Sequence, residues 1–241
     1  MKRVETASTQ LVQSARLPLH VQISELLTRE IQAGLLADGE KLPSERQLAR
    51  TLDVSVGTLR KALFDLQDKG LLIRIQGSGN YIKNNLDVEN VYALFNLELL
   101  KGGGLPSADL LSVKRLVKPD DIPVLSGSRY AFRFRRLRNL NGTLVAAEEI
   151  WLDGAYAKTI IQEQVSESLY MFYKDILGFW ITKTEDRVSV SSLPKWAERY
   201  WPDSFKEPVG YVERLSKDQD MNTAEFSRTW FDATRARFVS R

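Results

Sequence analysis

LPSERQLARTLDVSVGTLRKALFDLQDKGLLIRIQGSGNYI, residues 42–82, contains two short helical segments in immediate succession, followed by a hairpin. Ser44 and Gln47 have the three-residue spacing of a capping box, which marks the start of a helix. Ser55 is a suitable N-cap for a further helix that runs to about Lys69, because its side chain can accept a hydrogen bond from the backbone. Each helix therefore begins at a serine.

The hairpin and a preceding helix complete the pattern. Two short strands, 71–75 and 80–82, are joined by the turn Gln76-Gly77-Ser78-Gly79, in which glycine permits a tight reversal. Upstream, apolar residues recur at helical spacing over 20–33, and an Asp38-Gly39 turn follows. The sequence therefore predicts a winged helix-turn-helix, a fold that lays one helix in the major groove of DNA.

The helix that begins at Ser55 has two distinct sides. Leu59, Leu63 and Leu66 form an apolar stripe that we expect to be buried. The other side would approach DNA with its N-terminal end, where free N–H groups also attract phosphate. Glycine costs a helix about 1 kcal/mol against alanine, so the glycine at this end suggests close approach of a DNA backbone. The candidate contacts here are Gly57, Thr58, Arg60 and Lys61.

Composition excludes several classes of protein. The hydrophobic content of 43% and the charged content of 27% are typical of a globular domain. No stretch approaches the roughly 20 apolar residues of a membrane span, and residues 1–13 lack the apolar core of an export signal. With no cysteine and one histidine, His20, the chain is poorly supplied for a disulfide framework, a zinc site or His-based catalysis. We expect a cytoplasmic protein without a cofactor.

The positive charge is concentrated at one end of the chain. Of the 34 Lys and Arg and the 31 Asp and Glu, 12 and 9 lie in residues 1–85. The whole surplus of +3 therefore falls on the segment that resembles a DNA reader, and the remainder is neutral. A polyphosphate partner favours such a distribution.

The second half of the chain has a different pattern. Beyond a polar junction at 84–87, alternating strands predominate, and Asn141-Gly142 joins two of them in a primed turn. Strands with inserted helices predict an α+β domain built on an antiparallel sheet. The expected strands are 110–117, 130–140, 143–152, 181–191, 209–216 and 223–231. The expected helices are 92–101, 156–162, 168–177 and 194–201.

Four arginines on one expected strand are candidates for ligand binding. Alternation sends Arg136 and Arg138 to one face, and Arg133 and Arg135 to the other. Two adjacent guanidiniums repel each other unless an anion or carboxylates lie between them. Either an anionic ligand, with the expected helix start at Ser168 close by, or carboxylate partners such as Glu148 and Glu149 would meet this need.

Residues 18–83 resemble the winged-helix domain of the GntR family of bacterial transcription regulators. The matching segments are 42–46, 58–63 and 77–79. The resemblance implies DNA contacts at Arg46, Ser55, Thr58 and Arg60, and minor-groove contacts at Gln76 and Gly77. The sequence departs from the family at Val56, where an arginine that reads guanine is usual, and at Gly57, usually Thr or Ser. Loss of such an arginine removes about 1–3 kcal/mol of discrimination at one base pair.

The stretch from about 91 to 238 resembles the UTRA effector domain of the HutC branch of this family. The matching motifs are Arg136-Leu137-Arg138, Glu148-Glu149, Trp151-Leu152, Ser168-Leu169-Tyr170 and Arg214. The resemblance implies a chorismate-lyase-like fold that mediates dimerisation. It also implies that Arg136, Arg138, Ser168 and Tyr170 hold a phosphate, and that Glu148 and Glu225 bind the polar remainder of the ligand. Arg214 and Phe231 are further candidate effector contacts, and Phe231 stands where tyrosine is frequent. A sulfonate, carboxylate or phosphonate would suit the same arginines.

Together these patterns predict a ligand-responsive regulator. It comprises a flexible arm (1–15), a winged helix-turn-helix (16–83), a linker (84–90) and a UTRA-like effector-binding and dimerisation domain (91–241). We expect a homodimer that binds a palindromic operator and responds to a small anionic metabolite. The commoner arrangement in the resembled family is a repressor released by its effector, and an activator is the other possibility. Two alternatives remain. A lyase-type enzyme would use Glu148 or Glu225 as acid or base, and a DNA-binding protein without an effector would use the second domain only to dimerise.

Overall fold

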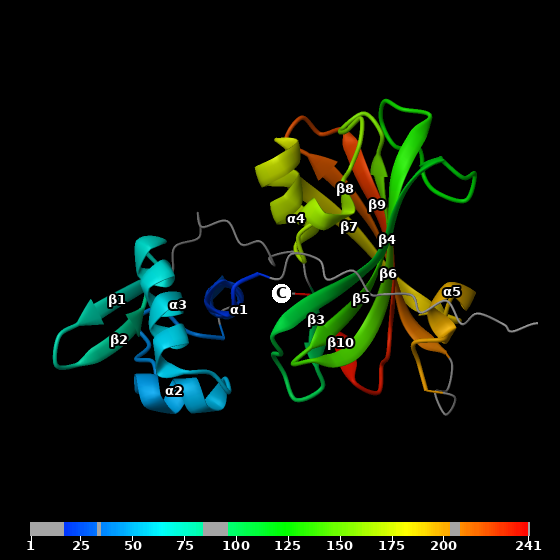
Figure 1. The fold of residues 1–241 in the computed structure, drawn as a ribbon. Coiled ribbons are helices and arrows are strands. Elements are labelled where there is room, and N and C mark those ends of the chain that lie inside the picture. Colours follow the sequence, from blue (N-terminus) through cyan, green and yellow to red (C-terminus); the bar gives the residue numbers. More distant parts are fainter. Residues whose placement is uncertain (1–16, 33–34, 84–95, 203–207, 241) are drawn as a thin grey trace, which may run out of the picture. The chain divides into compact units, whose positions relative to one another are not determined.

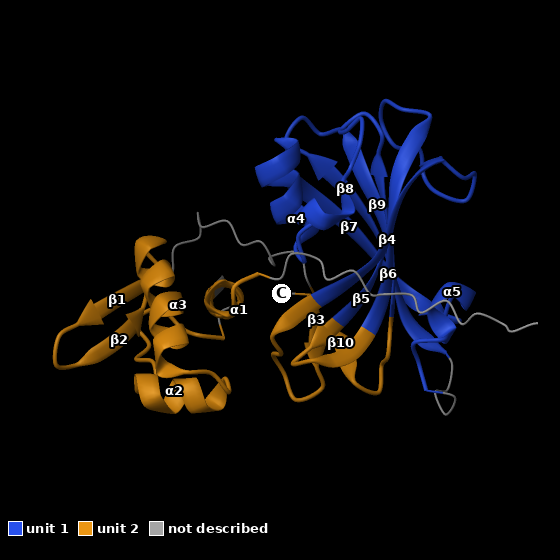
Figure 2. Ribbon diagram, viewed as in Figure 1, with its two compact units in different colours: residues 1–16, 108–138, 146–230 blue, residues 17–107, 139–145, 231–241 orange. Residues whose placement is uncertain are grey.

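The computed structural model of the chain describes residues 17–32, 35–83, 96–202 and 208–240 (Figure 1). Contacts divide the chain into two compact units, which Figure 2 colours separately. Unit 1 includes residues 108–138 and 146–230, and unit 2 includes 17–107, 139–145 and 231–241. The expected arm (1–15) and linker (84–90) lie outside the described residues.

The described residues up to Lys83 form the winged helix-turn-helix that the sequence predicts. The elements are α1 (Leu19–Gln32), α2 (Glu45–Thr51), α3 (Val56–Asp68), β1 (Leu72–Ile75) and β2 (Gly79–Ile82). The predicted caps are confirmed. Ser44 Oγ accepts a hydrogen bond from the Gln47 amide at 3.3 Å, and Ser55 Oγ accepts one from the Thr58 amide at 3.0 Å.

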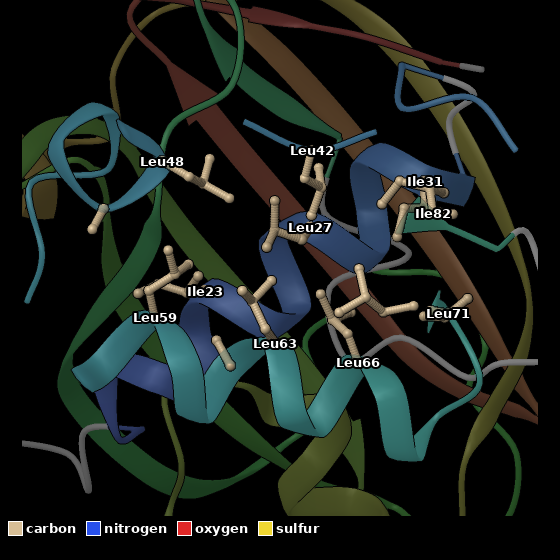
Figure 3. Packing of buried hydrophobic residues seen from close by; sticks show 13 residues of the cluster. Ile23, Leu27, Ile31, Leu42, Leu48, Leu59, Leu63, Leu66, Leu71 and Ile82 are labelled. Atoms are coloured by element: carbon tan, nitrogen blue, oxygen red, sulfur yellow. The ribbon is translucent and has the colours of Figure 1, made fainter. Parts of the chain in front are cut away.

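The core of this module lies between α1, α3 and the wing (Figure 3). The predicted stripe of α3 is confirmed, because Leu59, Leu63 and Leu66 are at most 1% exposed. They pack with Ile23 and other apolar residues of α1, and each such side chain contributes about 1.5–3 kcal/mol by its burial. Burial of these two stripes fixes α3 against α1 and leaves its N-terminal end exposed.

The wing is a two-stranded antiparallel hairpin. Leu72 pairs with Ile82 and Ile75 pairs with Gly79, so the two strands are in register up to the turn. Gly77 has a φ of 75°, which a glycine adopts at little cost. Leu72 and Ile82 are buried in the module's core, so the hairpin is anchored at its base while its turn is exposed.

A six-stranded sheet dominates the second half of the chain. Its strands are β4 (Pro106–Val117), β5 (Tyr130–Leu140), β6 (Thr143–Asp153), β7 (Ile181–Ser191), β8 (Val209–Asp218) and β9 (Thr223–Phe231). Their order is β4-β5-β6-β9-β8-β7. Asn141 and Gly142 have φ values of 50° and 73°, as the predicted primed turn requires. The expected α+β class is confirmed.

A helical segment covers one face of this sheet near β7 and β8 (Figure 1). It consists of α4 (Leu169–Phe172), capped by Ser168, and the π-helical turn η2 (Tyr173–Leu177). Phe172 and Tyr173 are buried in a core with Phe134 of β5 and Ala224 of β9. The segment is thereby held against the sheet. A short helix, α5 (Lys195–Glu198), occupies part of the range expected to be helical at 194–201.

Two predicted helices are wrong. The range 92–101 contains instead the strand β3 (Leu97–Leu99), which pairs with β10 (Ala236–Phe238), and its first four residues lie outside the described chain. The range 156–162 has no helix before the single 3-10 turn η1 (Gln162–Gln164). In the second range, Tyr156, Ala157 and Ile160 are partly buried against the core of the sheet, so tertiary packing outweighs their helix-like spacing.

Over the part of the chain that the structure describes, no helix is long and apolar enough to cross a membrane. Within the same part, no cluster of three or more acidic or histidine side chains could hold a metal ion.

Candidate functional site

An open groove on the winged module brings together residues from α2, α3 and the wing. Four residues predicted to bind DNA are among those that line it, namely Arg46, Arg60, Gln76 and Gly77. All four are exposed. A fifth, Lys61, lines an adjacent hollow together with Arg60. Convergent basic side chains beside an exposed glycine turn suit a sugar-phosphate backbone.

The remaining predicted residues lie at the start of α3. Ser55 Oγ and Thr58 Oγ1 are 2.8 Å apart, so both hydroxyls take part in the cap of the helix. Val56 is partly buried and packs against the core of the module. This packing gives the valine a structural role at a position where the family usually has an arginine.

Gly57 has room for a side chain, which makes a substitution informative. It lies inside α3, and a Cβ atom there would meet only Ser55 Oγ, at an ordinary distance of 3.8 Å. Gly57→Ala is therefore expected to raise the free energy of unfolding by about 0.5–1 kcal/mol, because alanine has the higher helix propensity. Thermal unfolding measures this gain. A loss of stability would show that the alanine side chain is not accommodated at this position of the helix.

Glu45, the first residue of α2, carries a negative charge into the basic groove. Its Oε2 lies 2.6 Å from Arg60 Nε, and its Oε1 lies 2.9 Å from Arg74 Nη2. Arg74 Nε also donates a hydrogen bond to Asn80 Oδ1 at 3.2 Å. The acid thus connects the third helix with the first strand of the wing. Glu45 and Arg74 were not among the residues predicted to bind DNA.

A second polar cluster lies between the sheet and the segment that contains α4. Arg136 of β5 contacts Glu148 of the neighbouring β6, with Nη2 and Oε2 2.6 Å apart. Arg136 Nη1 and Arg138 Nη1 donate hydrogen bonds to the Glu167 carbonyl oxygen at 3.0 and 3.4 Å. Arg138 Nε lies 3.8 Å from Glu148 Oε1. The alternation predicted for β5 is thus confirmed, and the carboxylate partner expected across the hairpin is present.

Glu225 of β9 is held by three hydroxyl groups. Tyr173 donates to Oε2 at 2.5 Å, whereas Ser216 and Tyr170 donate to Oε1 at 3.1 and 3.4 Å. Arg214 of β8 makes a two-pronged contact with Asp186 of β7, at 2.6 and 2.7 Å. The positive charge of Arg214 favours a lower pKa for both Glu225 and Tyr170, so the Arg214–Asp186 pair belongs to the same polar cluster as Glu225.

The pKa values of the two buried glutamates are shifted in opposite directions. Burial alone would raise the pKa of Glu148, but the Arg136 and Arg138 guanidiniums outweigh it and hold that pKa below its ordinary value. Burial raises the pKa of Glu225 in spite of its hydrogen bonds. Burial, together with the charge of Glu225, also raises the pKa of Tyr170 to about 12. Glu148 is therefore the stable anion of the cluster, and Glu225 is more easily neutralised.

Two other residues predicted to bind the effector, Ser168 and Phe231, lie at the start of α4 and at the end of β9. Ser168 is buried and caps α4, accepting a hydrogen bond from the Met171 amide at 3.3 Å. Phe231 lies at the end of β9, six residues beyond Glu225, which corresponds to about 20 Å along an extended strand. It is buried and belongs to unit 2. Phe231 is therefore remote from the carboxyl of Glu225.

The sequence did not identify several members of the cluster. They are Tyr173, Glu167, Asp186 and Ser216. Tyr173 follows Tyr170 at a spacing of three, which places both on one side of a helix and could have indicated it. Asp186 lies opposite Arg214 in the β7–β8 register, but that register is evident only in the folded chain.

Comparisons with known proteins agree with this geometry. Residues 19–82 match the family described as bacterial regulatory proteins, gntR family, and residues 101–237 match the UTRA domain. The HTH-type transcriptional regulator SmoD of Agrobacterium fabrum is 52% identical over 225 residues, which cover 93% of this chain and 96% of SmoD. The mannosyl-D-glycerate transport/metabolism system repressor MngR of Escherichia coli is 25% identical, over 92% of this chain and 95% of MngR.

The fold is also found in a solved structure. The possible transcriptional regulator YydK from Bacillus subtilis matches with a TM-score of 0.53 at 19% identity, over 93% of this chain and 99% of YydK. The chain thus belongs to the GntR family of bacterial regulatory proteins, in the HutC branch that carries a UTRA domain. It is a ligand-responsive transcription regulator, which binds DNA through its helix-turn-helix and an effector through its UTRA domain. Its relatives are regulators and not enzymes.

Proposed function

We propose that the chain is a homodimeric repressor in the cytoplasm, which leaves a palindromic operator when a small anionic metabolite binds. In this proposal residues 16–83 read DNA, 84–90 link the two domains, and 91–241 bind the effector and dimerise. The observation that carries the proposal is the buried polar cluster between the sheet and α4. A cluster of this kind suits a polar ligand, because its guanidinium and hydroxyl groups can exchange some of their internal ion pairs and hydrogen bonds for contacts with an anion.

The charges of the cluster favour an anion. Three guanidiniums, those of Arg136, Arg138 and Arg214, share it with the carboxyls of Glu148, Glu225 and Asp186. Burial raises the pKa of Glu225, so its negative charge is the most easily neutralised of the three. A phosphate, sulfonate, phosphonate or carboxylate would pair with these guanidiniums through charge-assisted hydrogen bonds. The hydroxyl groups of Tyr170, Tyr173 and Ser216 suit the polar remainder of a sugar-like ligand.

The dimer and the repressor role have separate support. One recognition helix covers one half-site, so a two-fold dimer would read two half-sites about one helical turn or its multiples apart. MngR is named as a repressor of a mannosyl-D-glycerate system, and glycerate is a carboxylate. The effector would shift the balance between the DNA-binding and released states by its difference in affinity for them, typically about 1–3 kcal/mol.

A thermal-shift screen tests whether the domain binds such an effector. The full chain would be melted alone and with separate sugar phosphates, sulfonates, phosphonates and carboxylates. A ligand that binds only the folded state raises the melting temperature. The active compound should then weaken binding to an operator fragment selected from the genome. If no anion in the panel alters melting or operator affinity, the effector part of the proposal is wrong.

Arg138→Ala is expected to weaken effector binding strongly. Removing one charge-assisted contact corresponds to about 1.5–3 kcal/mol, roughly a tenfold to 150-fold loss of affinity. Calorimetry with the compound found in the screen measures the loss, and operator binding without effector should be unchanged. Arg187→Ala is the control, because that side chain is 73% exposed on β7. Wild-type effector affinity in Arg138→Ala would place the site elsewhere.

A further inference from the structure

The Glu45 carboxylate is the central contact of the groove on the winged module. Each of its oxygens engages a different arginine, Arg60 on α3 at 2.6 Å and Arg74 on β1 at 2.9 Å. Arg74 is held from a second side by Asn80, which is only 6% exposed. These residues all line the same groove as Arg46 and Gln76.

Stability does not account for this acid. The Arg60 side chain is 65% exposed and that of Arg74 is 46% exposed, whereas that of Glu45 is 21% exposed, so both ion pairs are accessible to solvent at the arginine. Ion pairs in such surroundings contribute little to folding. A carboxylate on a surface that faces DNA also repels phosphate, which lowers affinity for any sequence. Glu45 therefore needs a role that offsets this repulsion.

The geometry of the pairs indicates such a role. Arg60 contacts Glu45 through Nε, so its Nη1 and Nη2 groups, which form a fork suited to guanine, lie at the other end of the guanidinium. Arg74 uses Nη2 for Glu45 and Nε for Asn80, and its Nη1 lies outside both contacts. These contacts favour one orientation of each guanidinium before DNA arrives, which reduces the loss of side-chain freedom on binding.

We infer that Glu45 is a positioning residue for sequence recognition, and that Arg74 is a phosphate-contacting residue of the wing. Glu45 holds Arg60 ready to contact a base edge and fixes Arg74 beside the groove. It therefore increases the preference for the operator, while its charge weakens binding to DNA of any other sequence. The inference rests on the proposed DNA-reading role of the module.

The test compares two duplexes of equal length, an operator selected from genomic fragments by the wild-type chain and a scrambled duplex. Glu45→Ala should lower operator affinity about tenfold, within the range for a lost bidentate arginine–guanine contact. Its affinity for the scrambled duplex should stay the same or rise, because one negative charge is removed. Glu45→Gln keeps one acceptor oxygen and should lose less. Glu163→Ala, which removes an exposed acid from unit 1, controls for net charge.

Arg74→Ala tests the second part of the inference. It should weaken binding to both duplexes by a similar factor and reduce the slope of log affinity against log salt by about 1 for each module bound. A loss confined to the operator would show that Arg74 reads a base, and would overturn its assignment to phosphate.

The outcomes separate the inference from the proposed function. If Glu45→Ala leaves the ratio of the affinities for the operator and the scrambled duplex unchanged, Glu45 is not a positioning residue. Thermal melting of each variant shows whether an equal loss reflects unfolding of the module. If the wild-type chain itself does not distinguish the two duplexes, the proposed function is wrong, and the inference is overturned with it.

Discussion

Glu148→Ala is expected to lower the free energy of unfolding by about 3–5 kcal/mol, the range for removing one partner of a buried ion pair. Glu148 is 8% exposed and Arg136 is 6% exposed, so the substitution leaves a guanidinium buried without its carboxylate. Arg138 would lose the same nearby negative charge. Chemical denaturation at neutral pH measures the loss.

An exposed ion pair on another strand of the same sheet provides the control for this prediction. Arg187 and Glu185 on β7 are 2.8 Å apart, with side chains 73% and 59% exposed. Glu185→Ala should therefore lower stability by less than about 1 kcal/mol. Similar losses in the two variants would show that burial does not govern the strength of the Glu148 contact.

The same prediction has a definite pH dependence. The folded-state pKa of Glu148 lies below its ordinary value of 4.5. Its contribution to the free energy of unfolding is therefore fully present above pH 4.5. The contribution is lost as pH falls through the folded-state pKa, because the carboxyl is then protonated in both states. The difference in the free energy of unfolding between wild type and Glu148→Ala should therefore become smaller below about pH 4.5.

Arg60→Ala should lower operator affinity by about 1–3 kcal/mol per half-site, or twice that for a dimer on two equivalent half-sites. Arg60 is exposed at the groove, and its contact with Glu45 contributes little to folding. The melting temperature should consequently remain close to that of wild type. Titration of a labelled operator duplex measures the change, with Arg187→Ala as the control. Unchanged operator affinity would contradict the assignment of α3 as the recognition helix.

The winged module could be predicted from the sequence because its signals are local. Ser44 and Ser55 each cap a helix through a backbone amide three residues later, so both ends of each interaction lie within one short segment. The leucine stripe of α3 likewise repeats at the helical period. The local helix signals and the tertiary packing agree here, so the fold of this segment can be predicted from its sequence.

The missed strands depend on contacts between distant parts of the chain. Leu97 pairs with Phe238, and a three-residue strand has too few residues to display an alternating pattern. The apolar residues around it were consequently interpreted as a helix over 92–101. Strand pairing at this separation is determined by tertiary structure and not by propensity.

The candidate effector cluster was predictable only in part. Alternation on β5 correctly placed Arg136 and Arg138 on one face, and the hairpin suggested Glu148 as a partner. The pairing of Tyr173 with Glu225 joins residues 52 positions apart, and nothing in either segment signals the other. A site formed by residues from several strands and a helix can be recognised only in the folded structure.

The core of the winged module has a practical consequence for protein engineering. Its buried members all come from residues 23–82, and Leu105 is the one partly buried residue packed against them that lies beyond Ile82 in the described chain. The segment is therefore nearly self-sufficient, and it could be transplanted onto a related sensor to make a chimera with a new gene target. In such a hybrid the packing that Leu105 adds to this core would have to come from the new sensor.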